Sequence, residues 1–149
     1  MKYIYIMCEG TEYWIELDND NQALRQIIDD NGDIEISCKT DCLAEGAVLL
    51  DELDGNIEII EKEVFETKWK DSLLDMRKEW EQKKGEYRVG SPVIGNFKYF
   101  YPQGAVIQLE GIQGICTDKL PSSLVVGTQL QCIVTGYDEV NFWIILTLR

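Results

Sequence analysis

The most informative absence in this sequence is histidine, of which the 149 residues contain none. Histidine is the commonest general acid or base in enzymes and a frequent zinc ligand, so its absence removes much hydrolytic and zinc chemistry. The glycines of the N-terminal half stand singly in predicted turns, and no nucleophile elbow, P-loop or dinucleotide-binding fingerprint occurs. The sequence therefore predicts a protein that is not an enzyme and that needs no cofactor or metal.

Long apolar runs are also absent. No segment approaches the roughly 18–20 consecutive apolar residues of a membrane-spanning helix. The segment Met1–Met7 is too short and too poor in positive charge for a signal peptide. We therefore expect a cytoplasmic protein with no membrane partner.

Cysteine is present in odd number and without a recognisable spacing. Cys38 and Cys42 are four residues apart, but a redox site would need a nearby cation to lower a thiol pKa, and only Lys39 is adjacent. We expect reduced, partly buried thiols. The five cysteines are Cys8, Cys38, Cys42, Cys116 and Cys132.

Positive charge is scarce in the N-terminal half. Residues 1–85 hold 10 Lys and Arg against 22 Asp and Glu, so nearly all of the formal charge of −13 lies there. A surface of this sign repels nucleic acids and membranes and attracts basic partners. Two interpretations stay open. The charge serves solubility alone, or this half binds a basic protein, as an immunity or antitoxin-like inhibitor that imitates nucleic acid would.

One helix is predicted over residues 62–84, where apolar side chains step by four, four, three and four residues and form a continuous stripe. Gly85 is the expected stop. We expect the stripe to pack on an N-terminal sheet and, towards its end, on the domain that follows. Its members are Phe65, Trp69, Leu73, Met76 and Trp80.

Five short strands are predicted before this helix. Asn31-Gly32, between the third and the fourth, is typical of a two-residue hairpin turn. The acidic residues around it lack the glycine and the distal glutamate of a calcium-binding EF loop. The fold class expected for residues 1–85 is α+β, a small antiparallel β domain with one long helix. The predicted strands cover 2–7, 13–17, 23–29, 34–38 and 57–60.

The last part of the chain, residues 86–149, has the pattern of a second domain, a five-stranded β-barrel. Gly95, inside the first strand, indicates a bend of the barrel wall. Closure removes the exposed edges that short strands otherwise present to other chains. The predicted strands cover 91–99, 105–109, 112–116, 129–137 and 142–148.

The sequence of this second domain resembles the S1 domain, the OB-fold module of ribosomal protein S1 and of many RNA enzymes. The resemblance lies in the order of parts and covers about 60 of the 149 residues. Val89-Gly90 stands at the entry to the first strand, and Gly104–Ile107 stands at the "GAFV" step of the family. Gly111–Ile115 stands at the turn that follows, and Ile144–Thr147 at the final strand.

The resemblance implies an RNA-binding face, in which bases stack on aromatic rings and cations hold the phosphates. Two positions depart from the family, with Val106 in place of a phenylalanine and Cys116-Thr117-Asp118 where a histidine is expected. The formal charge of residues 86–149 is −1, with 4 Lys and Arg against 5 Asp and Glu, so weak RNA binding is expected. The implied stacking residues are Phe97, Tyr99, Phe100 and Tyr101, and the implied phosphate contacts are Lys98, Lys119 and Arg88.

The expected partner is therefore single-stranded RNA or a basic protein. The two are distinguished by the surface around Tyr99. Rings exposed beside Lys98 and Lys119 favour RNA, and buried rings favour a protein partner.

Overall fold

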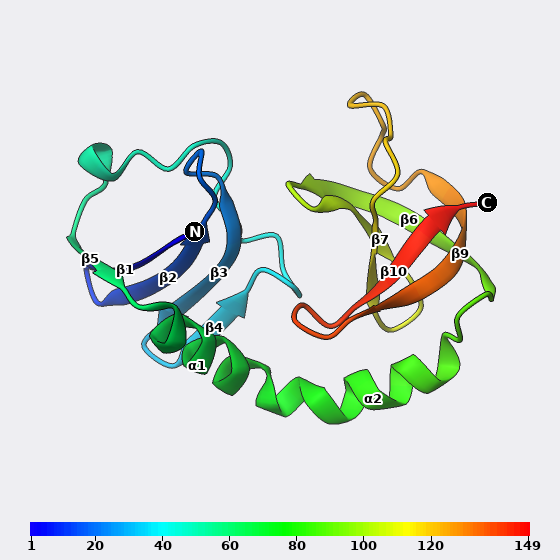
Figure 1. Ribbon diagram of the computed structural model, residues 1–149, viewed down its shortest axis with the longest axis horizontal. Coiled ribbons are helices and arrows are strands. Elements are labelled where there is room, and N and C mark those ends of the chain that lie inside the picture. Colours follow the sequence, from blue (N-terminus) through cyan, green and yellow to red (C-terminus); the bar gives the residue numbers. More distant parts are fainter. The chain divides into compact units, whose positions relative to one another are not determined.

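The computed structural model describes residues 1–149 and divides them into two compact units, Met1–Asp75 and Met76–Arg149 (Figure 1). The sequence placed the boundary after residue 85, at the end of the helix. In the structure the second half of the helical segment belongs to the barrel unit instead. No helix is both long and apolar enough to cross a membrane.

The first unit is built on a five-stranded sheet in which every neighbouring pair is antiparallel. The strand order is β4-β3-β2-β1-β5. All five predicted strands are confirmed, with ends that shift by a residue or two. They are β1 (Lys2–Cys8), β2 (Thr11–Leu17), β3 (Ala23–Asp30), β4 (Asp33–Ile36) and β5 (Asn56–Ile60).

The hairpin between β3 and β4 turns at Asn31-Gly32, as predicted. Both residues have positive φ, 55° and 94°, which is the backbone that a tight two-residue turn requires and that asparagine and glycine tolerate best. The Gly32 amide donates to Asp29 Oδ1 at 2.9 Å and so fixes the turn.

The predicted helix is confirmed, with an interruption. It comprises α1 (Lys62–Leu73), a 3₁₀ turn (Leu74–Met76) and α2 (Arg77–Glu86). Four of the five predicted stripe residues are buried, and Met76, in the 3₁₀ turn, is partly exposed. Gly85 does not end the helix, which continues to Glu86.

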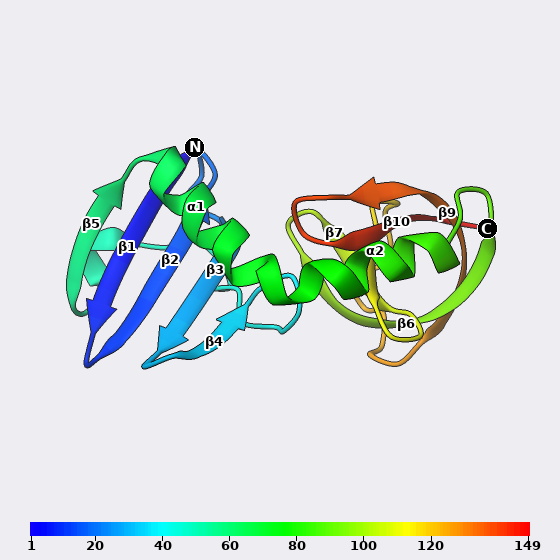
Figure 2. The same ribbon diagram turned by 90° about the horizontal axis from the view of Figure 1, so that it is seen from below.

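Helix α1 lies on one face of the sheet, and residues 37–55 cross the opposite face (Figures 1 and 2).

A buried arginine of β3 joins α1 to the sheet. Arg25 Nε and Nη2 donate to the two carboxylate oxygens of Glu16 at 2.8 and 2.9 Å, and its Nη atoms also donate to Glu66 on α1. Its guanidinium lies 4.9 and 5.0 Å from the ring centroids of Phe65 and Trp69.

The second unit is a closed five-stranded barrel with strand order β10-β8-β7-β6-β9. Only the β8–β10 pair is parallel. This mixed closed barrel is compatible with an OB-like fold, and all five predicted strands are present. They are β6 (Pro92–Tyr101), β7 (Gly104–Gln108), β8 (Gln113–Cys116), β9 (Gln129–Asp138) and β10 (Trp143–Leu148).

Helix α2 is held to the barrel by Trp80, which is 2% exposed. Its ring stacks on Phe142 with centroids 5.2 Å apart and planes at 11°. Its Nε1 donates to Glu139 Oε2 at 2.8 Å, and Lys84 Nζ donates to the other oxygen of the same carboxylate at 2.7 Å. These contacts explain why the unit boundary precedes α2.

Gly95 lies where the wall of β6 closely approaches the segment of β7 and Leu109. A Cβ at this position would stand 2.8 Å from Leu109 Cδ2 and 2.9 Å from the carbonyl oxygen of Gln108. The second of these atoms is backbone, so the clash cannot be relieved by a rotamer change. Glycine is thus required here by a close approach of two strands.

Substituting Gly95 by alanine is expected to lower the free energy of unfolding of the barrel by about 1–3 kcal/mol, the usual cost of overpacking. The matched control is Gly85→Ala in α2, where no atom lies within 4 Å of the new Cβ. That change is expected to raise stability by about 0.5–1 kcal/mol, because alanine is the better helix former. Urea unfolding followed by circular dichroism measures both, and effects of the same sign would contradict this account.

Candidate nucleic-acid interface

Strand β6 carries most of the residues implied in RNA binding, and a β-bulge at Lys98 reorders them. Phe97 pairs with Ile107, whereas Tyr99 pairs with Val106, so two adjacent residues of β7 pair with two residues of β6 that are two positions apart. After such an extra residue, the side chains of the strand point to the opposite face from the one that regular alternation predicts. The sequence alternation placed Phe97 and Tyr99 on one face, and the structure places them on opposite faces.

The four implied stacking rings therefore do not form one platform. Phe97 is 3% exposed and is a core residue of the barrel. Phe100 lies against it, with ring centroids 4.7 Å apart, but stays 42% exposed at the end of the strand. Tyr99 and Tyr101 pair at 4.9 Å, and of these Tyr101 is buried and Tyr99 is half-buried. Phe100 is the ring most available to a base.

The implied cations are exposed but dispersed. Lys98 lies two residues from Phe100 in the same strand. Arg88 precedes the first residue of β6, and the eight steps from Pro92 to Phe100 correspond to about 25 Å of extended strand. Lys119 lies in the segment between β8 and β9. Lys98 is thus the implied cation nearest to Phe100 along β6, whereas Arg88 precedes the other end of the strand.

Sequence reasoning missed an apolar pair beside the bulge. The segment between β8 and β9 ends against β6, because the Phe97 amide donates to the Thr128 carbonyl at 2.9 Å and the Gly127 amide donates to the Phe97 carbonyl at 2.8 Å. Val125 and Val126, just before this attachment, are 70% and 71% exposed. The sequence shows only two adjacent valines in a turn-rich segment. Without a periodic pattern around them, exposed valines cannot be distinguished from core residues.

The charge of the barrel unit differs from that of the sheet unit. Residues 76–149 hold 8 Lys and Arg against 7 Asp and Glu, a formal charge of +1, whereas residues 1–75 hold 6 against 20, a formal charge of −14. Part of the positive charge on α2 is neutralised locally. Hydrogen bonds raise the pKa of Lys83, through Glu86, and that of Lys84, through Glu139. The barrel is therefore close to neutral and does not strongly repel a phosphate backbone.

The five cysteines form no disulfide, and three of them are buried. Burial raises the pKa of Cys42 and that of Cys132 to about 11, so both are neutral thiols at pH 7. In Cys116-Thr117-Asp118, where the resemblance implied a histidine, Cys116 is fully buried in the barrel, whereas Thr117 and Asp118 are exposed.

No protein-family model and no curated protein sequence matches this chain.

Proposed function

We propose that this protein is a non-enzymatic binding protein whose barrel is an S1-like module that contacts single-stranded RNA. The observation that carries the proposal is the exposed ring of Phe100 beside Lys98, on the first strand of a closed OB-like barrel. OB-folds bind single strands by combining stacking on aromatic rings with cations that track the backbone. Phe100 supplies the ring and Lys98 the adjacent charge.

The proposed interaction is weak. One well-exposed ring, with a contribution from Tyr99, gives stacking of about 1–3 kcal/mol per base. With Lys98, Lys119 and Arg88 as the phosphate contacts, the logarithm of the association constant should fall against the logarithm of the salt concentration with a slope of about −2.

Fluorescence anisotropy with a short, labelled, mixed-sequence single-stranded RNA tests this function. Phe100→Ala is expected to weaken binding about tenfold, because it removes the stacking surface. The matched control is Ile94→Ala, which removes an apolar side chain that is 58% exposed from the same strand but takes away no ring. It is expected to leave binding unchanged.

Absence of binding at low salt would refute the proposal. Equal losses for Phe100→Ala and Ile94→Ala would refute stacking as its mechanism. The salt dependence gives an independent check, since Lys98→Ala should reduce the slope by about 0.7. Lys78→Ala, an exposed lysine of α2, should not change the slope.

A second candidate function rests on the sheet unit. Fifteen of its 20 carboxylates are exposed, so its formal charge of −14 is displayed to solvent. This charge favours an acidic protein-interaction factor, such as an immunity or antitoxin-like inhibitor, that binds a basic partner. Under this alternative the barrel contributes no contact, and Phe100→Ala leaves the interaction with the basic partner unchanged.

A further inference from the structure

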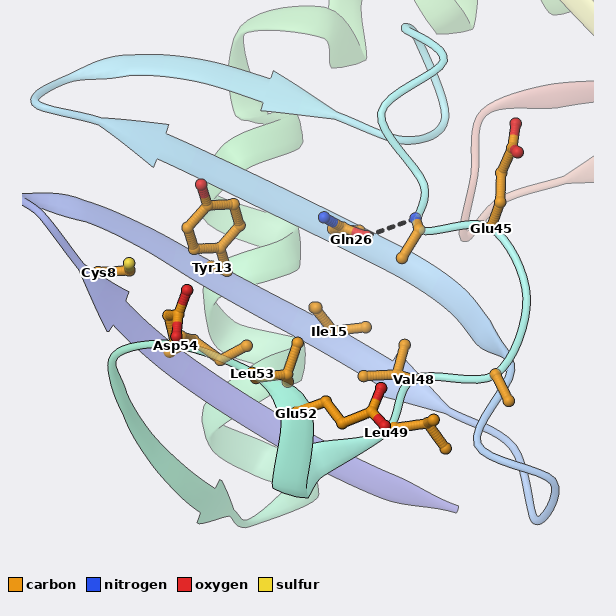
Figure 3. Close-up of a pocket in the computed structure, with 13 residues that line it drawn as sticks. Cys8, Tyr13, Ile15, Gln26, Glu45, Val48, Leu49, Glu52, Leu53 and Asp54 are labelled. Carbon is orange, nitrogen blue, oxygen red and sulfur yellow. Dashed lines mark hydrogen bonds between the residues drawn. The ribbon is translucent and has the colours of Figure 1, made fainter.

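A cavity of about 500 Å³ lies in the sheet unit, on the face of the sheet opposite α1 (Figure 3). Trp14 faces the helix, since Lys68 Nζ of α1 lies 4.3 Å from its ring centroid. Its neighbours Tyr13 and Ile15 point to the other side and form part of the cavity floor with Ile6. Residues 44–54 form the opposite wall. A volume of this size is typical of small-molecule sites.

The wall and floor are mainly apolar, with one buried polar group. Gln26 of β3 is only 5% exposed. Its Oε1 accepts the Ala44 amide at 2.8 Å, which fixes the orientation of the side chain. Its Nε2 makes no hydrogen bond within the protein and is directed along the sheet towards Tyr13 (Figure 3). An amide donor that lines the cavity favours a ligand with an acceptor oxygen.

The charged residues around the cavity all have one sign. Glu45, Glu52 and Asp54 line it and are exposed, and no lysine or arginine lines it. Figure 3 shows Glu52 and Asp54 on the wall that faces the sheet, whereas the Glu45 side chain extends outwards. An anionic ligand would meet these carboxylates with no compensating cation, whereas a cation would be attracted.

We propose that this cavity binds a primary alkylammonium group that carries an acceptor oxygen at the other end of an apolar chain. The chain contacts Ile6, Ile15 and Val48, and the ammonium is attracted by the carboxylates of Glu52 and Asp54, which lie at different parts of the wall (Figure 3). The oxygen accepts a hydrogen bond from Gln26 Nε2. A free amino alcohol has this chemistry, and so does a lysine side chain with its own peptide carbonyl. The site is independent of the barrel and of its proposed function.

Chemical-shift titration of the ¹⁵N-labelled full chain tests the site with three probes of equal length. These are 6-amino-1-hexanol, 1,6-hexanediol and 6-hydroxyhexanoate, which differ only in the charge of one end. The amine is expected to shift the amide resonances of residues 44–54 and of β1–β3, the diol to bind several-fold more weakly, and the carboxylate to cause no shift. Equal binding of all three, or no shift with the amine, would overturn the proposal.

Two variants test the role of the carboxylates. Glu52→Gln with Asp54→Asn is expected to weaken binding of the amine about tenfold, at three- to fivefold for each exposed charge removed, and to leave binding of the diol unchanged. The control is Glu58→Gln, which removes one carboxylate charge, against two in the double variant, from β5 at a position that pairs with Tyr5 on the helix side of the sheet. An equal loss for Glu58→Gln would mean a general effect of charge and would overturn the assignment.

A further arm distinguishes the two sources of the amine. The peptide Gly-Lys-Gly, blocked at both ends, presents the lysine side chain, and 6-amino-1-hexanol presents the free compound. Tighter binding of the peptide identifies a lysine of a partner protein as the ligand, and tighter binding of the amino alcohol identifies a small molecule. Binding of neither compound refutes the site.

Discussion

Arg25→Ala is expected to lower the free energy of unfolding of the sheet unit by about 3–5 kcal/mol, the cost of leaving a buried charge without its partner. Arg25 is 6% exposed and its main partner Glu16 is 8% exposed. Alanine would leave the Glu16 carboxylate buried without a cation. It would also remove the guanidinium that lies over the rings of Phe65 and Trp69.

The measurement is urea unfolding at pH 7, followed by the amide resonances of β1–β4. The control is Lys68→Ala, which removes a more exposed ion pair between Lys68 Nζ and Asp29 Oδ2 at 3.1 Å, with side chains 25% and 17% exposed. This pair is expected to contribute no more than about 1 kcal/mol. Replacing both charges, as in Glu16→Leu with Arg25→Met, should restore much of the loss, because no unpaired buried charge then remains at residue 16. A cost for Arg25→Ala equal to that of Lys68→Ala would contradict this account.

The difference between the wild-type protein and Arg25→Ala should depend on pH. The hydrogen bond from Arg25 lowers the pKa of Glu66 below its ordinary value of 4.5. A carboxyl whose pKa is lower in the folded state stabilises that state fully above its unfolded pKa, and the contribution is lost as pH falls through the folded pKa. The part of the stability difference that Glu66 contributes should therefore shrink as pH falls below about 4.

The sequence predicted those parts of the fold that depend on local periodicity and turn chemistry. The helical stripe from Phe65 to Trp80 repeats at the spacing of one helix face, and Asn31-Gly32 has the φ preferences of a tight turn. These signals need no knowledge of what packs against them. Every predicted strand was therefore found, although the helix is interrupted at residues 74–76.

The candidate interface was harder to predict, because it depends on pairing between distant strands. Phe97-Lys98-Tyr99 has the apolar–polar–apolar alternation of a regular strand, and no residue in this segment indicates a bulge. The bulge is visible only in the register, since β6 must pair with β9 along its first half and with β7 along its second. One extra residue at that transition puts Tyr99 on the face opposite to that of Phe97 and brings the ring of Phe100 against Phe97.

The cavity in the sheet unit lay beyond sequence reasoning for a different reason. Arg25 and Gln26 are adjacent polar residues in a predicted strand, and a strand that faces solvent on one side would expose one of them. Both are buried, because α1 covers one face of the sheet and residues 37–55 cover the other. The covering segment is mostly irregular and has no period that predicts where it lies.

Trp80→Ala is expected to lower the free energy of unfolding of the barrel unit by about 3–5 kcal/mol, the usual cost of truncating a buried tryptophan. The variant loses the stack on Phe142 and the hydrogen bond to Glu139. Trp80→Phe separates the two contributions. It retains a ring against Phe142 but loses the bond to a charged acceptor, which should cost about 1.5–3 kcal/mol.

The readout for Trp80 must be specific to one unit, because a chain with two compact units need not unfold in a single transition. Hydrogen exchange of the amides in β9 and β10 should accelerate in Trp80→Ala, while that of β1–β4 should not change. Equal acceleration in both units would contradict the assignment of Trp80 to the barrel core.

The variant also distinguishes the effect of barrel folding on RNA binding from the effect of the contact residues. Where the barrel is unfolded, RNA binding should be lost although Phe100 and Lys98 are intact, and it should return with the folded fraction when the temperature is lowered.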